Sequence, residues 1–145
     1  MPFTAFENYA SCSGLTVAVT AEEQNSDYES GLARIQDDEL WHIRTARNTP
    51  TKPGAFVAFW RRCADGTTAP FTSADPSSGL LVFVHHEGRR GVFRFTKTHL
   101  DQLGITAGTH SGKRGFRVYP SWCTGLNASA TKTQREQAQA FQIFA

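Results

Sequence analysis

The stretch LLVFVHHEGRRGVFRF, Leu80–Phe95, decides the fold of this chain. Its first five residues are apolar on both faces, as in a strand at the centre of a sheet. The polar HHEGRRG leads directly into VFRF, Val92–Phe95, so the stretch predicts an antiparallel hairpin. No apolar run in the chain approaches the roughly twenty residues that span a bilayer, and no membrane segment is expected.

Three further segments are predicted to be strands. Leu40–Ala46 alternates partly between apolar and polar residues and is followed by the proline-rich turn NTPTKPG. Ala55–Trp60, AFVAFW, is dense in aromatic residues and predicts a core strand. Phe116–Tyr119 predicts a last strand, which Pro120 ends.

Helices are expected in three places. Good helix formers favour a short helix at Glu22–Tyr28, and Thr98 and Gly104 bound another at about His99–Leu103. A long C-terminal helix is predicted from Asn127 or Ser129 to about Ile143. It would carry one stripe of residues, namely Ala130, Gln134, Ala138 and Phe141.

Together these elements predict an α+β fold in a single domain, residues 1–145, with residues 1–20 as a poorly ordered N-terminal extension. The expected architecture is a mainly antiparallel sheet of about five strands, with the long C-terminal helix and shorter helices packed on one face.

The cysteines indicate a reducing compartment. Cys12, Cys63 and Cys123 are odd in number, widely spaced and never in a CxxC pair, which disfavours a disulfide framework or a zinc site. The first twenty residues carry Glu7 and no basic stretch, so a secretory signal is not expected. We therefore expect a cytoplasmic, monomeric protein.

Charge divides unevenly along the chain. Residues 1–40 hold eight acids and one base, a net charge of −7, whereas residues 41–145 hold fourteen bases and five acids, a net charge of +9. Either the acidic part packs against the basic part and neutralises it, or a positive face stays open to an anion, of which nucleic acid is the commonest.

Four segments resemble the MepB family in their order and spacing over roughly residues 20–145. They are TARNTPTKPGAFVAFWRR (Thr45–Arg62), GVFRFTKTHLDQLGI (Gly91–Ile105), GKRGFRVYPSW (Gly112–Trp122) and NASATKTQREQAQAF (Asn127–Phe141). The family takes its name from an operon with a multidrug efflux pump and its repressor. The resemblance implies a small cytosolic α+β protein that binds nucleic acid or a nucleotide. Two positions depart from the family pattern: Arg47 stands where Lys is expected, and Cys123 follows YPSW where an acid is frequent.

Four blocks place cations beside aromatic or planar groups, which is the composition of a site for phosphates and bases. The candidate ligand-binding residues are Arg44, Arg47, Thr51 and Lys52 around the proline turn, Arg61 after Trp60, Lys113, Arg114, Arg117, Tyr119 and Trp122 around RVYPSW, and Lys132 and Thr133 in the last helix. Each block has an alternative structural interpretation. The turn is then a rigid connector, and Arg117 stacks on a core Tyr119 or Trp122 for stability.

Several enzyme-like patterns fail on their spacing. GTHSGK, Gly108–Lys113, has too few residues between its glycines for a phosphate-binding Walker A loop, and Arg114 stands in place of the Mg²⁺-binding hydroxyl. The SxxK match that begins at Ser129 has no partner motif. His85 and His86 are neighbours that face opposite sides of a strand, so a metal site is not expected there.

Three hypotheses on function follow. The first is a module that binds nucleic acid or nucleotides through a basic, aromatic-lined face and needs no cofactor. The second is a Mg²⁺-dependent phosphodiesterase or nuclease that uses Glu29 with Lys52 and Arg47. The third is a non-catalytic module whose basic face meets an acidic protein partner or its own N-terminal segment.

Overall fold

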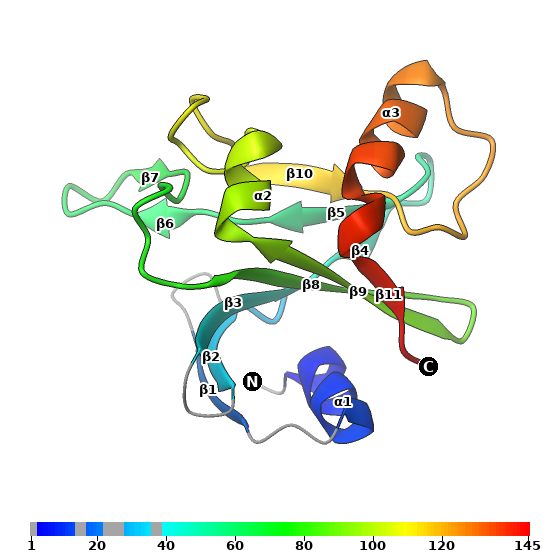
Figure 1. Ribbon diagram of the computed structural model, residues 1–145, viewed down its shortest axis with the longest axis horizontal. Helices are drawn as coiled ribbons and strands as arrows, with labels where there is room; N and C mark the ends of the chain where they lie inside the picture. Colours follow the sequence, from blue (N-terminus) through cyan, green and yellow to red (C-terminus); the bar gives the residue numbers. More distant parts are fainter. Residues whose placement is uncertain (1–2, 14–16, 22–27, 36–38) are drawn as a thin grey trace.

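The computed structural model describes residues 3–13, 17–21, 28–35 and 39–145 (Figure 1). Its helices are α1 (Thr4–Ser13), α2 (Lys97–Gln102), α3 (Ala128–Gln137) and the 3₁₀ turn η1 (Ala138–Ala140). Its strands are β1 (Val17–Ala21), β2 (Gly31–Ile35), β3 (Glu39–Thr45), β4 (Arg47–Asn48), β5 (Ala55–Ala58), β6 (Arg61–Arg62), β7 (Thr68–Ala69), β8 (Gly79–His86), β9 (Arg89–Thr96), β10 (Gly115–Val118) and β11 (Phe141–Ile143).

The largest sheet that the described residues form has six strands in the order β1-β2-β3-β8-β9-β11. The predicted hairpin is confirmed as β8 and β9, which pair from Gly79 with Thr96 to His86 with Arg89. Both sides of β8 are buried from Leu80 to Val84, as its apolar sequence predicts for a central strand. One pair, β3 with β8, is parallel, so the sheet is mixed and larger than the sequence indicates.

A second, smaller sheet packs on one side of the first, and here the prediction of a single sheet is wrong. Its order is β10-β5-β4, and both pairs are antiparallel. The predicted strands Ala55–Trp60 and Phe116–Tyr119 are confirmed in this sheet as β5 and β10. The chain continues from β5 into an arm formed by β6 and β7, which projects at the left of Figure 1.

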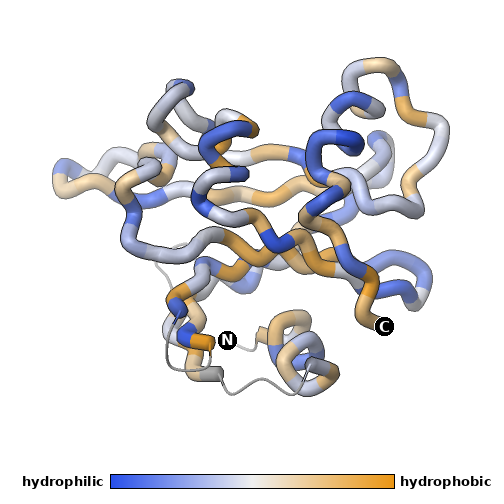
Figure 2. The backbone as a smooth tube through the Cα atoms, in the orientation of Figure 1, coloured by the Kyte–Doolittle hydropathy of each residue, from blue (hydrophilic) through white to orange (hydrophobic). Residues whose placement is uncertain are grey.

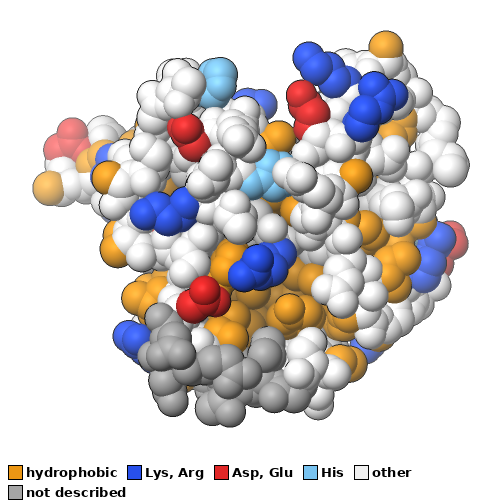
Figure 3. Space-filling view, viewed as in Figure 1, with side chains coloured by type: hydrophobic (Ala, Val, Ile, Leu, Met, Phe, Trp, Pro, Cys, Tyr) orange, Lys and Arg blue, Asp and Glu red, His pale blue; other side chains and the backbone are white. Residues whose placement is uncertain are grey.

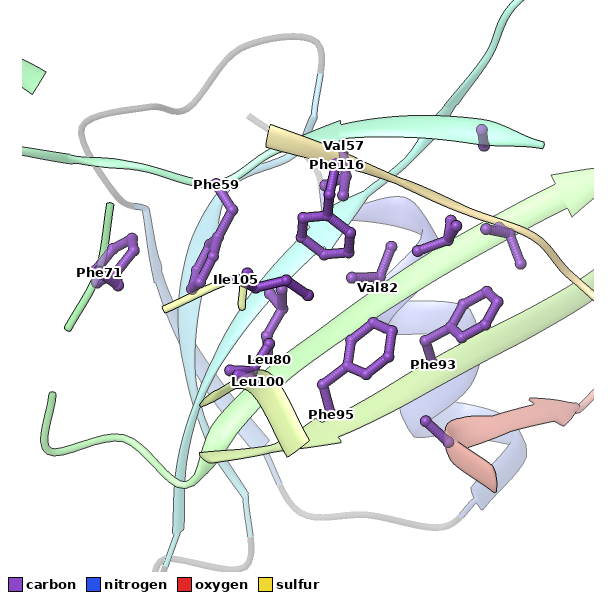
Figure 4. Close-up of a cluster of buried hydrophobic side chains, with 14 residues drawn as sticks. Val57, Phe59, Phe71, Leu80, Val82, Phe93, Phe95, Leu100, Ile105 and Phe116 are labelled. Atoms are coloured by element: carbon purple, nitrogen blue, oxygen red, sulfur yellow. The ribbon is translucent and has the colours of Figure 1, made fainter. Parts of the chain in front are cut away.

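The main hydrophobic core lies between the two sheets. Alternate residues of β5 and β10 point inward, among them Val57 and Phe116, and meet Leu80, Val82 and Phe95 of the large sheet (Figure 4). The tube in Figure 2 is most apolar along these strands, whereas the tip of the β8–β9 hairpin is hydrophilic. This contact fixes where the ends of the small sheet lie over the large one.

The opposite side of the large sheet has its own core under α1. Phe6 of α1 is buried and packs edge-on against Phe83 of β8, with Trp41 and Ile43 in the same cluster. Helices therefore cover both sides of the large sheet, not one. Part of the segment 1–20, for which the sequence predicts a poorly ordered extension, forms α1 and β1.

The prediction of a long C-terminal helix is wrong. Asn127 does cap α3, since its side chain accepts a hydrogen bond from the N–H of Ala130, but the helix ends at Gln137. After η1, Phe141 pairs with Phe93 of β9, and their rings lie 4.7 Å apart. Pairing with β9 and aromatic packing therefore outweigh the helical stripe.

The other helices compare as follows. The one predicted near His99 is α2, whose cap is Thr96 rather than Thr98. Residues 22–27 of the helix expected at Glu22–Tyr28 lie outside the described residues. Within the part of the chain that the structure describes, no helix is long and apolar enough to cross a membrane.

A buried polar cluster anchors the loop before β8. The ring of His42 of β3 packs against the stacked rings of Phe59 and Phe71, and its Nε2 is 3.0 Å from Asp75 Oδ2. The same carboxylate accepts hydrogen bonds from the N–H and the hydroxyl of Ser77. Partial burial raises the pKa of Asp75, but the hydrogen bonds from His42 and Ser77 outweigh it and bring the pKa to about 2.

We expect Asp75→Asn to flatten the acid side of the stability profile. A carboxyl whose folded-state pKa falls from 3.8 to about 2 stabilises the fold above about pH 4, and this contribution is lost as the pH drops toward 2. Urea unfolding at a series of pH values should show the wild type losing more free energy of unfolding than the variant between pH 5 and pH 3. Parallel profiles would show that the ionised Asp75 does not stabilise the fold.

The first residue of β8, Gly79, has no room for a side chain. Its φ is +153°, and a Cβ there would lie 2.0 Å from the carbonyl oxygen of Phe95 and 2.9 Å from the ring of Trp41. We expect Gly79→Ala to lower the free energy of unfolding by roughly 3 kcal/mol, measured by urea unfolding. Gly66→Ala is the matched control, because Gly66 also has a positive φ (+91°) but has nothing within 4 Å. Equal losses in both variants would mean that backbone conformation alone accounts for the effect.

Candidate functional site

Three loops line a pocket of about 270 Å³. The elements that carry these loops are labelled in Figure 1. The three loops are the β4–β5 loop, the tip of the β8–β9 hairpin and the loop that follows β10. We call it the loop pocket, and its main lining side chains are Asn48, Thr49, Lys52, Arg89, Trp122 and Cys123. The proline turn and the YPSW segment, which are far apart in the sequence, therefore share one site.

An Arg–Trp stack forms one wall of the loop pocket. The Cζ of Arg89 lies 5.1 Å from the centre of the Trp122 ring, and the edge of Phe141 supports that ring at 5.5 Å. Arg89 is exposed and pairs with Glu87 only at 3.8 Å, a surface contact that contributes little. Its guanidinium is therefore available to a ligand while the indole orients it.

The β4–β5 loop is held in shape by Arg117 of β10. Arg117 Nη1 donates to the hydroxyl of Thr49 at 3.0 Å and to the carbonyl of Pro53 at 3.2 Å. Asn48 Nδ2 donates to the carbonyl of His85 at 2.8 Å and so ties this loop to the hairpin. These hydrogen bonds tie the β4–β5 loop to β10 and to the end of β8, next to the hairpin tip.

Tyr119 closes the base of the same loop. Gly54 has a φ of +78°, and a Cβ there would lie 2.7 Å from Tyr119 Cδ1. The backbone around Tyr119 is in turn fixed by the buried Gln137 of α3, which accepts from the N–H of Tyr119 and donates to the carbonyl of Arg117. Arg117 and Tyr119 thus brace the site from behind.

Cys123 places a thiol in the loop pocket. Burial raises the pKa of Cys123, and this outweighs the N–H of Gly54 and the charge of Arg89, both of which lower it. The thiol is therefore protonated at neutral pH. A protonated thiol carries no charge and can contact an anion without repelling it.

Other predicted site residues lie next to the loop pocket. Lys113 and Thr133 line an adjoining groove of about 210 Å³ between β10 and α3, together with Arg117 and Tyr119. Arg47 and Thr51 are exposed on β4 and in the β4–β5 loop, and Lys132 is exposed on α3. In Figure 3 the Lys and Arg side chains on the visible face are spread out, with one group over α3.

Three predicted residues have other surroundings. Arg44 is fully buried, donates to the carbonyl of Ile43 and lies over the ring of Phe59. Arg61 donates to the carbonyl of Pro70, and Arg114 donates to that of Thr68, so both support the β6–β7 arm. The structure therefore does not gather all twelve candidates on one face.

Sequence reasoning missed His86, Arg89 and Asn48. The polar HHEGRRG tip was a visible signal, since a hairpin must carry its tip to one end of the sheet. What the sequence does not show is that the small sheet brings the proline turn to that same end.

Glu29, which the nuclease hypothesis requires, lines a different pocket. Its carboxylate accepts from the hydroxyl of Thr45 at 2.7 Å and from the N–H groups of Thr4 and Ala5 at the start of α1. That pocket, of about 380 Å³, lies between α1 and the large sheet and does not include Lys52. Over the described ranges, His, Cys, Asp and Glu side chains form no group that could hold a metal ion.

All three loops lie inside residues 22–143, which match the family model described as MepB-like. The chain belongs to the MepB-like family. The crystal structure of MepB is similar to it with a TM-score of 0.85 and 32% sequence identity, over 99% of this chain and 97% of that one. Among curated proteins, none matches the chain. The loop pocket is thus part of a MepB-like domain, and the MepB likeness extends beyond the matched residues to α1.

We expect Cys123 of this MepB-like chain to react with iodoacetamide more slowly than the exposed Cys12 at neutral pH. The thiolate is the nucleophile, and burial both raises the pKa of Cys123 and restricts access to it. Timed labelling followed by peptide mass spectrometry measures both rates. Urea should remove the difference, and equal rates in the folded protein would contradict the enclosed position of Cys123.

Proposed function

We propose that this MepB-like chain binds nucleic acid or a nucleotide through the loop pocket. Lys52 and Arg89 neutralise a phosphate there, and the outer face of the Arg89 guanidinium, stacked on Trp122, receives a base. The Arg89–Trp122 stack is the observation that carries the proposal. It joins the two chemical requirements of a nucleotide, positive charge and a planar surface, at one place.

The charge around the loop pocket supports the proposal. Lys52, His86 and Arg89 line it, and none of its described lining residues is Asp or Glu. In the sequence, residues 40–64 and 102–135 contain no acid, and these segments supply two of the three loops. The third loop, the hairpin tip, carries one acid, Glu87, which lies 3.8 Å from Arg89 and 3.5 Å from His86. The cations of the pocket still outnumber this acid, so a polyanion meets net attraction.

Of the alternatives, a Mg²⁺-dependent phosphodiesterase has less support, because Glu29 lines the α1 pocket and binds Thr45 and the start of α1. An acidic protein partner fits the charge but does not need the Arg–Trp stack. Three free cysteines support the cytoplasm as the place where the protein acts.

Fluorescence anisotropy with labelled single-stranded DNA and RNA of about ten nucleotides tests the proposal. We expect saturable binding that weakens steeply with salt, because phosphate contacts release counterions. Arg89→Ala and Trp122→Leu should each weaken binding on the order of tenfold, as expected for the loss of a stacked contact.

Lys97→Ala is the matched control, since Lys97 is exposed at the start of α2 and does not line the loop pocket. It should bind like the wild type. No binding at low salt, or equal losses in the control and the pocket variants, would refute the proposal. Shortening of the oligonucleotide only when Mg²⁺ is added would favour the nuclease alternative.

A further inference from the structure

The outward side of the small sheet carries an aligned row of two arginines and an aromatic ring. Phe56 of β5 pairs with Arg47 of β4 on one side and with Arg117 of β10 on the other. Residues directly opposite each other in an antiparallel sheet project to the same side. The intervening residues, Ala55 and Val57, face the core, so the row faces outward.

The aromatic surface continues along β5. The ring of Phe56 lies across Gly115, where a Cβ would fall 2.5 Å from Phe56 Cζ. Burial alternates through Phe59, which is buried, to Trp60, which is half-buried on the outward side. Arg62 stacks on Trp60 with its Cζ 5.4 Å from the ring. We call this surface the sheet platform, formed by Arg47, Phe56, Trp60, Arg62, Gly115 and Arg117.

The platform adjoins the loop pocket. Arg117 belongs to the platform row, and its guanidinium donates to Thr49 and Pro53 in the pocket wall. β4, β5 and β10 all lie in the two acid-free segments, residues 40–64 and 102–135. A ligand that extends from the loop pocket over the small sheet therefore meets arginines and aromatic rings. The strands beneath it contribute no carboxylate.

We propose that the ligand is a single-stranded nucleic acid that extends from the loop pocket across the sheet platform. Unpaired bases stack on Phe56 and Trp60, while Arg47 and Arg62 contact the phosphates between them. A mononucleotide occupies the loop pocket alone. A single-stranded nucleic acid uses both surfaces. Phosphates and bases alternate along it, and the platform likewise offers both arginines and aromatic rings. This inference rests on the proposed function and adds the polymeric nature of the ligand.

The test compares two labelled ligands in anisotropy titrations: a dinucleotide, which fits the loop pocket only, and an oligonucleotide of about ten nucleotides. Phe56→Leu removes the ring but keeps an apolar side chain, and Arg47→Gln removes one exposed charge. Phe144→Leu is the aromatic control, because Phe144 packs on the other side of the large sheet against Tyr9 and Phe83. Thermal unfolding confirms that each variant is folded, and the exposed Arg47 position keeps the test valid if Phe56→Leu unfolds.

We expect the longer ligand to bind more tightly than the dinucleotide. Phe56→Leu should weaken the longer ligand by about tenfold, and Arg47→Gln should lower the slope of log affinity against log salt by about 0.7. Neither variant should change dinucleotide binding, and Phe144→Leu should change neither ligand.

Three results would overturn the inference. Equal wild-type affinity for both ligands, or unchanged binding of the longer one in both platform variants, would refute the platform and leave the loop pocket as the whole site. Equal weakening of both ligands by a platform variant would show that it acts through the loop pocket. If the wild type binds neither ligand, the proposed function itself fails, and the inference fails with it.

Discussion

The apolar contact between the inner sides of the two sheets determines where the small sheet, and the part of the candidate site that it carries, lies over the large sheet. The small sheet gains stability chiefly by burying this side, because each fully buried aromatic or branched side chain contributes about 2 kcal/mol. Val57, Phe116 and Val118 are almost completely buried against β8 and β9. With its inner side fixed in this way, the small sheet holds Arg47, Phe56 and Arg117 on its outward side and carries the proline turn toward the hairpin tip.

Ala46 is the point where the chain passes from one sheet to the other. Thr45 still pairs with Phe83 in the large sheet, Ala46 donates its N–H to the carbonyl of Phe83, and Arg47 pairs with Phe56 in the small sheet. This short connection leaves little freedom between the layers. The hydrogen bond from Asn48 to His85 then joins the two layers again at the loop pocket. A site built from three loops can thus have a defined shape, since each loop is anchored in a packed strand.

Much of the fold could be predicted from the sequence, because apolar runs and alternation reflect burial directly. The β8–β9 hairpin, β3, β5 and β10 follow from such patterns. The parallel β3–β8 pair and the division into two sheets depend on contacts between distant segments, which no local pattern encodes. Phe141 shows the same limit, since it continues a helical stripe but pairs as a strand.

The candidate site was predictable only in part, for a related reason. Lys52 and Trp122 do line one pocket, as their motifs suggest, but Arg89 reaches it from a hairpin tip whose position depends on the length of β8 and β9. From the sequence, Arg44 was predicted to be a cation of the binding surface, but in the structure it is completely buried. An arginine carries the same charge in a core, in a brace and in a binding site, so sequence alone does not separate Arg44, Arg117 and Arg89.

The most direct test of the central claim is a ¹H–¹⁵N NMR titration of the protein with a short single-stranded oligonucleotide. The account predicts that the largest amide shifts fall in the three loops of the pocket, at Asn48–Gly54, His86–Arg89 and Trp122–Thr124. Residues of α1, which lie across the large sheet, should not respond. Shifts centred on α1 and Glu29, or no shifts at all at low salt, would contradict the assignment of the loop pocket as the binding site.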